Sequence, residues 1–201
     1  KETAHQLGTP LSSLMAWVEI LKSQGVDGST TDEMSKDVHR LETITDRFSK
    51  IGSTPKLVEE NIYDVLENAV DYIRNRTSNK VKIEIISTGN LTIKLSISLF
   101  NWVIENLCKN AIDAMEGNGN ITLDVIEKRD NIIIDIIDTG KGIPSTKQKA
   151  IFEPGYTTKQ RGWGLGLSLT KRIIEDYHKG KIFVHKSGEG KGTTFRIVLN
   201  K

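Results

Sequence analysis

Apolar residues recur at a helical spacing in the first quarter of the chain. Between residues 7 and 21 they follow alternating steps of four and three, a heptad pattern that predicts a helix with one apolar stripe. This stripe consists of Leu7, Leu11, Leu14, Val18 and Leu21. The polar stretch SQGVDGSTT interrupts the pattern, and Thr30 with Glu33 predicts a capping box for a second helix. The second stripe consists of Met34, Val38, Leu41, Phe48 and Ile51.

Two such helices would form a hairpin, which buries too little apolar surface on its own. Pairing two hairpins into a four-helix bundle solves this problem, so the pattern favours a homodimer through residues 1–52. The stretch GSTPK separates the hairpin from the rest of the chain. We therefore expect two domains, residues 1–55 and residues 56–201.

Beyond residue 60, helical and alternating patterns are interleaved. The sequence predicts helices over residues 61–76, 97–116 and about 165–179. It predicts strands at KVKIEII, LTIKL, KIFVHKS and TTFRIVLN, and a hairpin of strands in NITLDVIEKRDNIIIDIID. Helices mixed with largely antiparallel strands indicate an α+β layer fold.

Charge and cysteine content narrow the classes of function. The net charge is +2, so no overall field argues for nucleic acid as a partner. Residues 139–172 nevertheless hold seven basic side chains against Glu153 alone, which suits a triphosphate ligand as well as it suits a solvated loop. The single cysteine, Cys108, favours a reducing compartment and is expected as a small buried residue. No apolar run approaches the ~18 residues of a membrane span.

Two polar motifs could carry chemistry. Asn106 and Asn110 in ENLCKNAIDAM are four residues apart and share a helix face, so their amides could ligate Mg²⁺ or contact phosphate. Asp138 follows an apolar strand in DTGKGIP and could accept a hydrogen bond from an exocyclic amine such as that of adenine. Gly140 and Gly142 would let the backbone approach a ligand. Taken singly, an asparagine pair that satisfies backbone groups and a common Asp-Gly turn remain the alternatives.

Two glycine motifs lie nearer the C-terminus. In RGWGLGLSL, Gly162, Gly164 and Gly166 precede a predicted helix, whose N-terminal N–H groups could bind a phosphate. The glycines of GEGKGTTF lie between two predicted strands, just before Thr193, where an ordinary hairpin loop is the alternative. Each motif alone is weak evidence.

The order of these motifs is more specific than any one of them. Together with Phe152-Glu153-Pro154, they resemble the N, G1, F, G2 and G3 boxes of the ATP-binding domain shared by histidine kinases, gyrase-type topoisomerases, Hsp90 and MutL. The resemblance covers residues 61–201 and implies a Bergerat-type α/β sandwich, with Mg²⁺ held by Asn110 and assisted by Asn106. The ATP-contacting residues that it implies are Asn106, Asn110, Asp138, Gly140, Gly142, Lys159, Gly162, Gly164, Leu165, Gly166 and Thr193.

Within this superfamily, one position separates hydrolysis from transfer. The ATPase branches carry a water-activating glutamate where this chain has Asn106, four residues before Asn110. Glu105 is adjacent but lies ~100° around the helix. The resemblance therefore implies a site that transfers a phosphoryl group from ATP to an acceptor other than water.

The stretch AHQLGTPLSSL resembles the H-box of sensor histidine kinases, usually written His-Glu-x-x-Thr/Asn-Pro. The heptad register puts His5 on the solvent side, and an imidazole, whose ordinary pKa is ~6.5, offers a neutral nucleophile at pH 7. The resemblance implies that His5 accepts phosphate from ATP and passes it to an aspartate of a response regulator receiver domain. It also implies that Thr9 orients water for dephosphorylation of the regulator.

The H-box departs from the family pattern at two positions. Gln6 replaces the usual acid beside the histidine, and Gly8 replaces the usual Arg or Lys. A degenerate kinase that acts as a phosphatase or scaffold therefore remains open, as does an ATPase or protein kinase of the same nucleotide fold. The resemblance also implies a cytoplasmic catalytic portion, with a membrane reached only through a sensor region N-terminal to this sequence. His178, near the end of the last predicted helix, is expected as a C-terminal cation.

Overall fold

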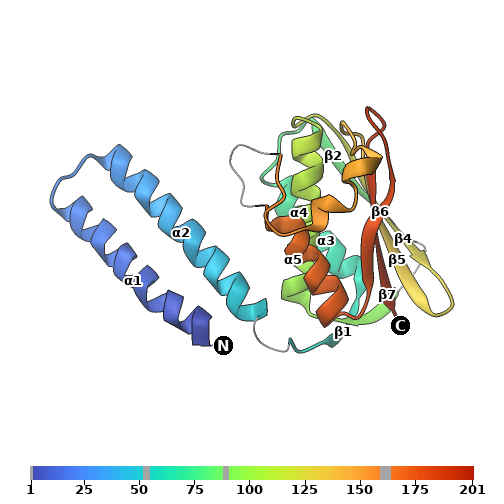
Figure 1. Ribbon diagram of the computed structural model, residues 1–201, viewed down its shortest axis with the longest axis horizontal. Coiled ribbons are helices and arrows are strands. Elements are labelled where there is room, and N and C mark those ends of the chain that lie inside the picture. The colour runs from blue at the N-terminus through green and yellow to red at the C-terminus, as the bar shows by residue number, and fades with distance from the viewer. Residues whose placement is uncertain (1, 52–54, 88–90, 159–163) are drawn as a thin grey trace. The chain divides into compact units, whose positions relative to one another are not determined.

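The chain folds as two compact units, Lys1–Pro55 and Lys56–Lys201. The computed structural model (Figure 1) describes residues 2–51, 55–87, 91–158 and 164–201, of which residues 2–9, 40 and 42–51 are described by their backbone alone. None of the helices in these ranges has the length and apolarity that crossing a membrane requires.

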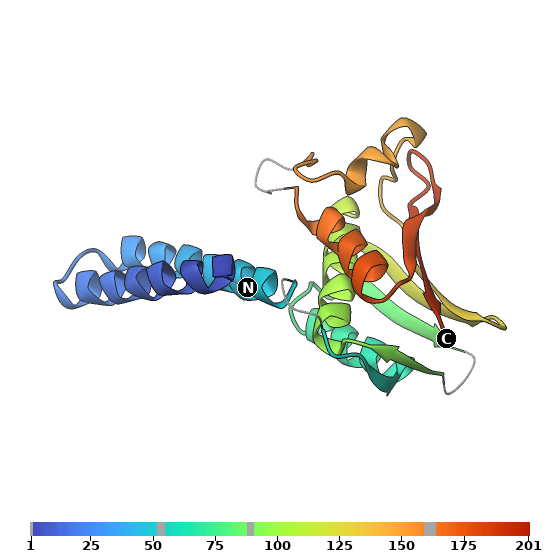
Figure 2. The same ribbon diagram turned by 60° about the horizontal axis from the view of Figure 1, so that its bottom comes forward.

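The first unit is a hairpin of two helices, α1 (Glu2–Ser23) and α2 (Gly28–Ile51), which run side by side (Figures 1 and 2). Leu11, Val18 and Val38 form a buried cluster between them. Leu14 was expected in the same stripe but is 45% exposed. Two helices alone can cover only one side of each other, so part of the predicted apolar stripe faces outward in the single hairpin.

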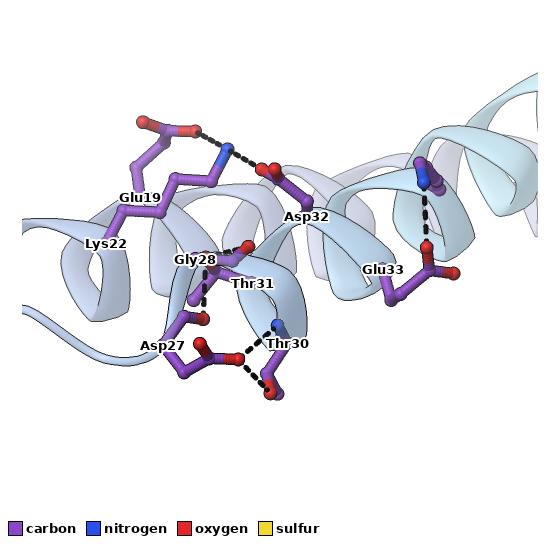
Figure 3. Close-up of polar contacts among 9 residues, drawn as sticks. Glu19, Lys22, Asp27, Gly28, Thr30, Thr31, Asp32 and Glu33 are labelled. Carbon is purple, nitrogen blue, oxygen red and sulfur yellow. Dashed lines mark hydrogen bonds and ion pairs between the residues drawn. The ribbon is translucent and has the colours of Figure 1, made fainter.

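The start of α2 differs from the predicted capping box. Asp27, not Thr30, caps the helix: its Oδ2 accepts the Thr30 N–H at 2.9 Å and the Thr30 hydroxyl at 3.0 Å (Figure 3). These hydrogen bonds, the backbone one first, lower the pKa of Asp27. Glu33 pairs with Lys36 at 2.7 Å instead of reaching back to the cap. Asp is as good a cap as Thr and lies one turn earlier, so the capping prediction was wrong.

The second unit contains a five-stranded sheet. The strand order is β2-β4-β5-β7-β6, with β2 and β4 parallel and the other neighbours antiparallel. This confirms the largely antiparallel sheet and places β5 at its centre. The strands are β2 (Val81–Ser87), β4 (Gly119–Glu127), β5 (Asn131–Asp138), β6 (Lys181–Ser187) and β7 (Thr193–Asn200).

Helices cover one face of this sheet (Figures 1 and 2). They are α3 (Ile62–Arg74), α4 (Ile97–Ala114) and α5 (Gly166–Arg172), the last continued by the π-helical segment η3 (Ile173–Tyr177). The predicted helices and the predicted strands are all present. Three kinds of element were not predicted: the strand β1 (Val58–Asn61), which pairs with β3 (Thr92–Leu95), the 3-10 turns η1 (Ser145–Lys147) and η2 (Ala150–Phe152), and the π geometry of η3.

The core lies between the helices and the sheet, and it determines where the functional residues point. Alternate residues of β5, namely Ile132, Ile134 and Ile136, are at most 1% exposed. Asp138 continues this alternation at the end of the strand, so it shares the helix-facing side of the sheet. Cys108 on α4 is fully buried as expected, and burial raises the pKa of its thiol to about 12.

His178 is not the helix-end cation that its position in the sequence suggested. It is 7% exposed, its Nδ1 lies 2.9 Å from the Ile173 carbonyl, and its Nε2 accepts the Ser96 N–H at 3.0 Å. The ring therefore caps the N-terminus of α4, where Ser96 makes no side-chain cap of its own. The rings of Phe100 and His178 pack in a T-shaped arrangement, with their centroids 5.9 Å apart. Burial lowers the pKa of His178, partly offset by the hydrogen bond to Ile173, so the imidazole is neutral.

We expect the free energy of unfolding to fall as the pH drops below about 6.5. Because the pKa of His178 is lowered in the folded state, only the unfolded chain gains this proton there. The His178→Gln variant keeps an acceptor but cannot titrate, so urea unfolding between pH 5 and 8 should show a flatter dependence on pH. Equal slopes in the two proteins would contradict the neutral cap.

Candidate functional site

Asp138 lies at the end of the central strand and is 5% exposed. One of its oxygens, Oδ1, accepts the N–H of Gly140 at 2.8 Å and the N–H of Thr193 at 3.2 Å. Burial raises the pKa of Asp138, and these two hydrogen bonds act in the opposite direction. Within the described residues, Oδ2 makes no hydrogen bond to protein. The carboxylate is therefore held in place by one oxygen and presents the other as an acceptor.

The loop after Asp138 is fastened to the turn between β6 and β7. Gly192 N–H donates to the Gly140 carbonyl at 2.9 Å, and Gly190 N–H donates to the Lys141 carbonyl at 2.8 Å. A Cβ on Gly192 would lie 2.0 Å from the Asp138 carbonyl oxygen, and Gly192 has φ +70°. This glycine is needed because two stretches of backbone touch here.

Gly140 and Gly142 have the same explanation. A Cβ on Gly142 would lie 1.8 Å from the Gly188 carbonyl oxygen, and one on Gly140 would lie 2.8 Å from the backbone of Ala114. The sequence suggested that these glycines let backbone approach a ligand. The approach that the structure records is to other segments of the chain, and it gives the loop a fixed shape.

Ser187, which no sequence motif contains, links the same two loops. Its hydroxyl accepts the Ile143 N–H at 2.8 Å and lies 3.0 Å from both the Gly192 carbonyl oxygen and the Thr193 hydroxyl. Sequence reasoning missed it because a serine at the end of a strand has no distinguishing local pattern. Its partners come together because β6 pairs with β7 and because the loop after β5 packs against the turn between these two strands.

Asn106 and Asn110 lie on α4 and are half-buried, as expected for one side of an amphipathic helix. Asn106 Nδ2 donates to the hydroxyl of Thr170 on α5 at 2.9 Å. A Cβ on Gly166 would lie 2.5 Å from Asn106 Oδ1. The structure therefore brings Asn106 and Gly166 together, and adds Thr170, which was not predicted.

The end of α4 joins these residues to the Asp138 loop. Ala114, one turn after Asn110, contacts Gly140, and its carbonyl accepts the Lys141 N–H at 3.0 Å. The predicted contact residues thus form two groups, one at the Asp138 loop and one where α4 meets α5, connected along a single helix. No group of three or more His, Cys, Asp or Glu side chains in the described ranges could hold a metal ion.

The glycine-rich segment before α5 is only partly described. Lys159 and Gly162 lie outside the described residues. Gly164 has φ +64°, and its carbonyl accepts the Gly155 N–H at 3.0 Å, which ties the two ends of the segment together. Leu165 occupies the N-cap position of α5 and, as a leucine, has no polar side-chain atom that could cap the helix.

The residues of the H-box lie on α1, in the first unit. His5, Gln6 and Thr9 are within the helical range Glu2–Ser23, and their side chains lie outside the described part of the structure. Pro10 is accommodated inside this helix.

Comparison with known proteins places these features in context. Residues 96–201 match the family model described as histidine kinase-, DNA gyrase B- and HSP90-like ATPase. The chain is 30% identical over 204 residues to sporulation kinase E of Bacillus subtilis and 32% identical over 206 residues to sensor histidine kinase ZraS of Salmonella typhi, covering 98% of this chain in each case. It spans 27% and 44% of the lengths of those proteins.

A solved structure with a similar fold is the catalytic domain of histidine kinase ThkA. The TM-score is 0.66 at 26% sequence identity, and the match covers 73% of this chain and 96% of that domain. The second unit therefore has the α+β fold of a histidine kinase catalytic domain.

Proposed function

The chain belongs to the family of histidine kinase-, DNA gyrase B- and HSP90-like ATPases, and from this premise we propose that it is the catalytic core of a sensor histidine kinase. In this proposal residues 56–201 bind ATP with Mg²⁺, and residues 1–55 form the dimerisation and phosphotransfer hairpin that carries His5. The observation that carries the proposal is the pairing of the Asp138 loop with the asparagine face of α4. This arrangement lies in a chain that is similar to sensor histidine kinases over 98% of its length.

Asp138 binds the adenine ring in this proposal. Its Oδ1 is engaged by two backbone N–H groups, which leaves Oδ2 to accept a hydrogen bond from the exocyclic amine. Gly140, Gly142 and Thr193 support this carboxylate by holding the loop against the β6–β7 turn. Lys159, Gly162, Gly164 and Leu165 belong to the segment that would cover the phosphates.

Asn110 is suited to hold Mg²⁺ beside the phosphates. Its amide oxygen is a hard ligand, and Mg²⁺ takes few protein ligands because it keeps phosphate oxygens and water in its shell. When bound, the ion supplies neutralisation of the phosphate charge, on which phosphoryl transfer largely depends. The chain's own contribution is to place that amide on a rigid helix, one turn from the Asp138 loop.

His5 is the proposed acceptor. One imidazole nitrogen attacks the γ-phosphorus, the bond from phosphorus to the β–γ bridging oxygen breaks, ADP leaves, and the imidazole gives up its proton to water. The phosphoryl group then passes to an aspartate of a response regulator receiver domain, and Thr9 orients water for dephosphorylation of that regulator. Transfer is favoured over hydrolysis because Asn106, which has no basic atom, stands where a water-activating glutamate is needed.

Incubation of the chain with γ-labelled ATP and Mg²⁺ tests this proposal. We expect a label that is stable to base, labile to acid and absent from the His5→Ala variant. Transfer of the label to a receiver domain would then identify the regulator. Retained ATP binding without label would favour the phosphatase or scaffold alternative, and release of free phosphate without label would favour an ATPase.

The hairpin is proposed to dimerise as a four-helix bundle. Leu14, Trp17, Met34 and Leu41 are between 36% and 60% exposed in the single hairpin, which leaves an apolar surface for a second copy. We expect Leu14→Glu to weaken dimerisation ~10-fold or more, because the charge would be buried in the bundle. Ser13→Glu adds the same charge at an outward heptad position and serves as the control.

Sedimentation equilibrium over a range of concentrations measures this effect. A wild-type chain that stays monomeric at high concentration would contradict the bundle, as would equal weakening by the Leu14 and Ser13 variants.

A further inference from the structure

The side chain of Asn106, on α4, lies where α4 packs against α5. Gly166 and Thr170 are four residues apart on α5 and therefore lie one above the other on the same face. The amide of Asn106 lies against both: its nitrogen donates to the Thr170 hydroxyl at 2.9 Å, and its oxygen occupies the space that a side chain at Gly166 would need. One amide thus spans a full turn of the neighbouring helix.

This contact is buried at its inner end. Thr170 is 0% exposed, so its hydroxyl depends on protein partners for its hydrogen bonds. Replacing the hydroxyl by a methyl group would leave the Asn106 amide without this acceptor. The contact therefore helps to set the position of α5 relative to α4.

We propose that Asn106 is a positioning residue, which fixes the N-terminal turn of α5 against α4 through Thr170, and that Asn110 alone supplies the metal-facing amide. This inference rests on the proposed function, because its consequence is for ATP binding. The nitrogen and the oxygen of the Asn106 amide both lie against α5. Its oxygen faces Gly166, whose lack of a side chain is what permits the approach.

The position of α5 matters because this helix comes directly after the segment whose two ends, Gly155 and Gly164, are joined by a backbone hydrogen bond. A displacement of its first turn would move the point where that segment rejoins the domain. Asn106 therefore acts on nucleotide affinity through the backbone of α5 rather than through the metal ion.

A double-mutant cycle on the 201-residue chain tests the assignment. Thr170→Val keeps the shape of the side chain and removes the hydroxyl, Thr170→Ser keeps the hydroxyl, and Asn106→Ala removes the amide. ATP affinity is measured by calorimetry with and without Mg²⁺, and amide hydrogen exchange of α5 is measured without nucleotide. Asn110→Ala is the reference for a lost metal ligand.

We expect Thr170→Val and Asn106→Ala each to weaken ATP binding by ~3- to 10-fold, and the double variant to be no weaker than the weaker single variant. The ratio of the ATP affinity with Mg²⁺ to that without Mg²⁺ should stay at the wild-type value in both single variants and should fall in Asn110→Ala. Thr170→Ser should bind ATP like the wild type. The α5 amides should lose protection in both single variants and no further in the double.

Two results would overturn the assignment. A fall in the Mg²⁺ ratio for Asn106→Ala comparable to that for Asn110→Ala would make Asn106 a metal ligand. Multiplicative effects in the double variant, on affinity or on hydrogen exchange, would show that the two side chains act separately. A wild-type chain that binds no ATP would overturn the proposed function instead, and the hydrogen-exchange cycle would still decide whether Asn106 positions α5.

Discussion

The Asp138→Asn variant is expected to lose ATP affinity by ~10- to 100-fold and to gain affinity for inosine triphosphate relative to ATP. In the wild type, Oδ1 of Asp138 is held by the N–H groups of Gly140 and Thr193, and Oδ2 is proposed to accept the adenine amine. An asparagine can keep the first pair of hydrogen bonds, because its carbonyl oxygen can take the place of Oδ1. Its NH₂ group then takes the place of Oδ2.

This substitution turns an acceptor into a donor with almost no change in shape. Two donors face each other when adenine is bound, which costs the ~1–3 kcal/mol of an unmade buried hydrogen bond. Inosine carries a carbonyl oxygen where adenine carries the amine, so the same NH₂ group can donate to it. The reversed preference distinguishes a base contact from a general loss of folding, which would weaken both nucleotides equally.

Calorimetry with ATP and with inosine triphosphate measures this change in nucleotide preference, and Asp130→Asn provides the matched control. Asp130 lies in the exposed turn between β4 and β5, so the same change in charge there should leave both affinities as they are. Unchanged ATP binding by Asp138→Asn would remove this residue from the nucleotide site.

Much of this site could be predicted because its parts are local patterns. The apolar face of α4 and the alternation in β5 indicate where Asn106, Asn110 and Asp138 lie, and the structure has each on the expected element. A glycine-rich loop is equally visible in a sequence. The reason for its glycines is not, because the atoms that a Cβ on Gly142 or Gly192 would strike belong to segments distant in the chain.

What could not be predicted are the contacts between distant side chains. Ser96 and His178 are 82 residues apart, and Asn106 and Thr170 are 64 apart. A histidine near a helix end looks like a surface cation until strand and helix packing bury it. The strand β1 was missed because its sequence, VEEN, contains a single apolar residue and therefore shows no alternation of apolar and polar positions.

In the hairpin, the sequence predicts the two helices but not which residues of their apolar stripes are buried between them. Its heptad pattern predicted the two helices, and α1 and α2 are present. The pattern describes a stripe wide enough for two neighbours, whereas the hairpin gives each helix only one. The exposure of Leu14 beside the buried Leu11 and Val18 is the part of the stripe that a second copy would have to cover.

The second prediction concerns Gln6, which stands where the H-box usually carries an acid. We expect Gln6→Glu to raise the initial rate of His5 phosphorylation by ~10²-fold, the lower end of what general-base help contributes. Imidazole must lose a proton as it bonds to phosphorus, and a carboxylate beside it can take that proton. A glutamine amide can hold the ring by a hydrogen bond but cannot act as the base.

Initial rates at neutral pH and saturating Mg-ATP measure this effect most directly. At that pH a glutamate is ionised, because its ordinary pKa is ~4.3, and nucleotide binding does not limit the rate. Gln6→Asn keeps the amide and is the control, which should show no gain. Thr9→Ala is expected to act on another step and to slow dephosphorylation of the partner regulator.

The direction of the Gln6→Glu result decides between two roles for the wild-type residue. A higher rate would mean that the natural protein is a working but slow kinase, in which water accepts the proton. A flat or lower rate would contradict the missing-base interpretation, since a carboxylate would then offer nothing that the amide lacks. The glutamine would in that case serve to orient the His5 ring, and a glutamate, which cannot donate a hydrogen bond when ionised, would do this less well.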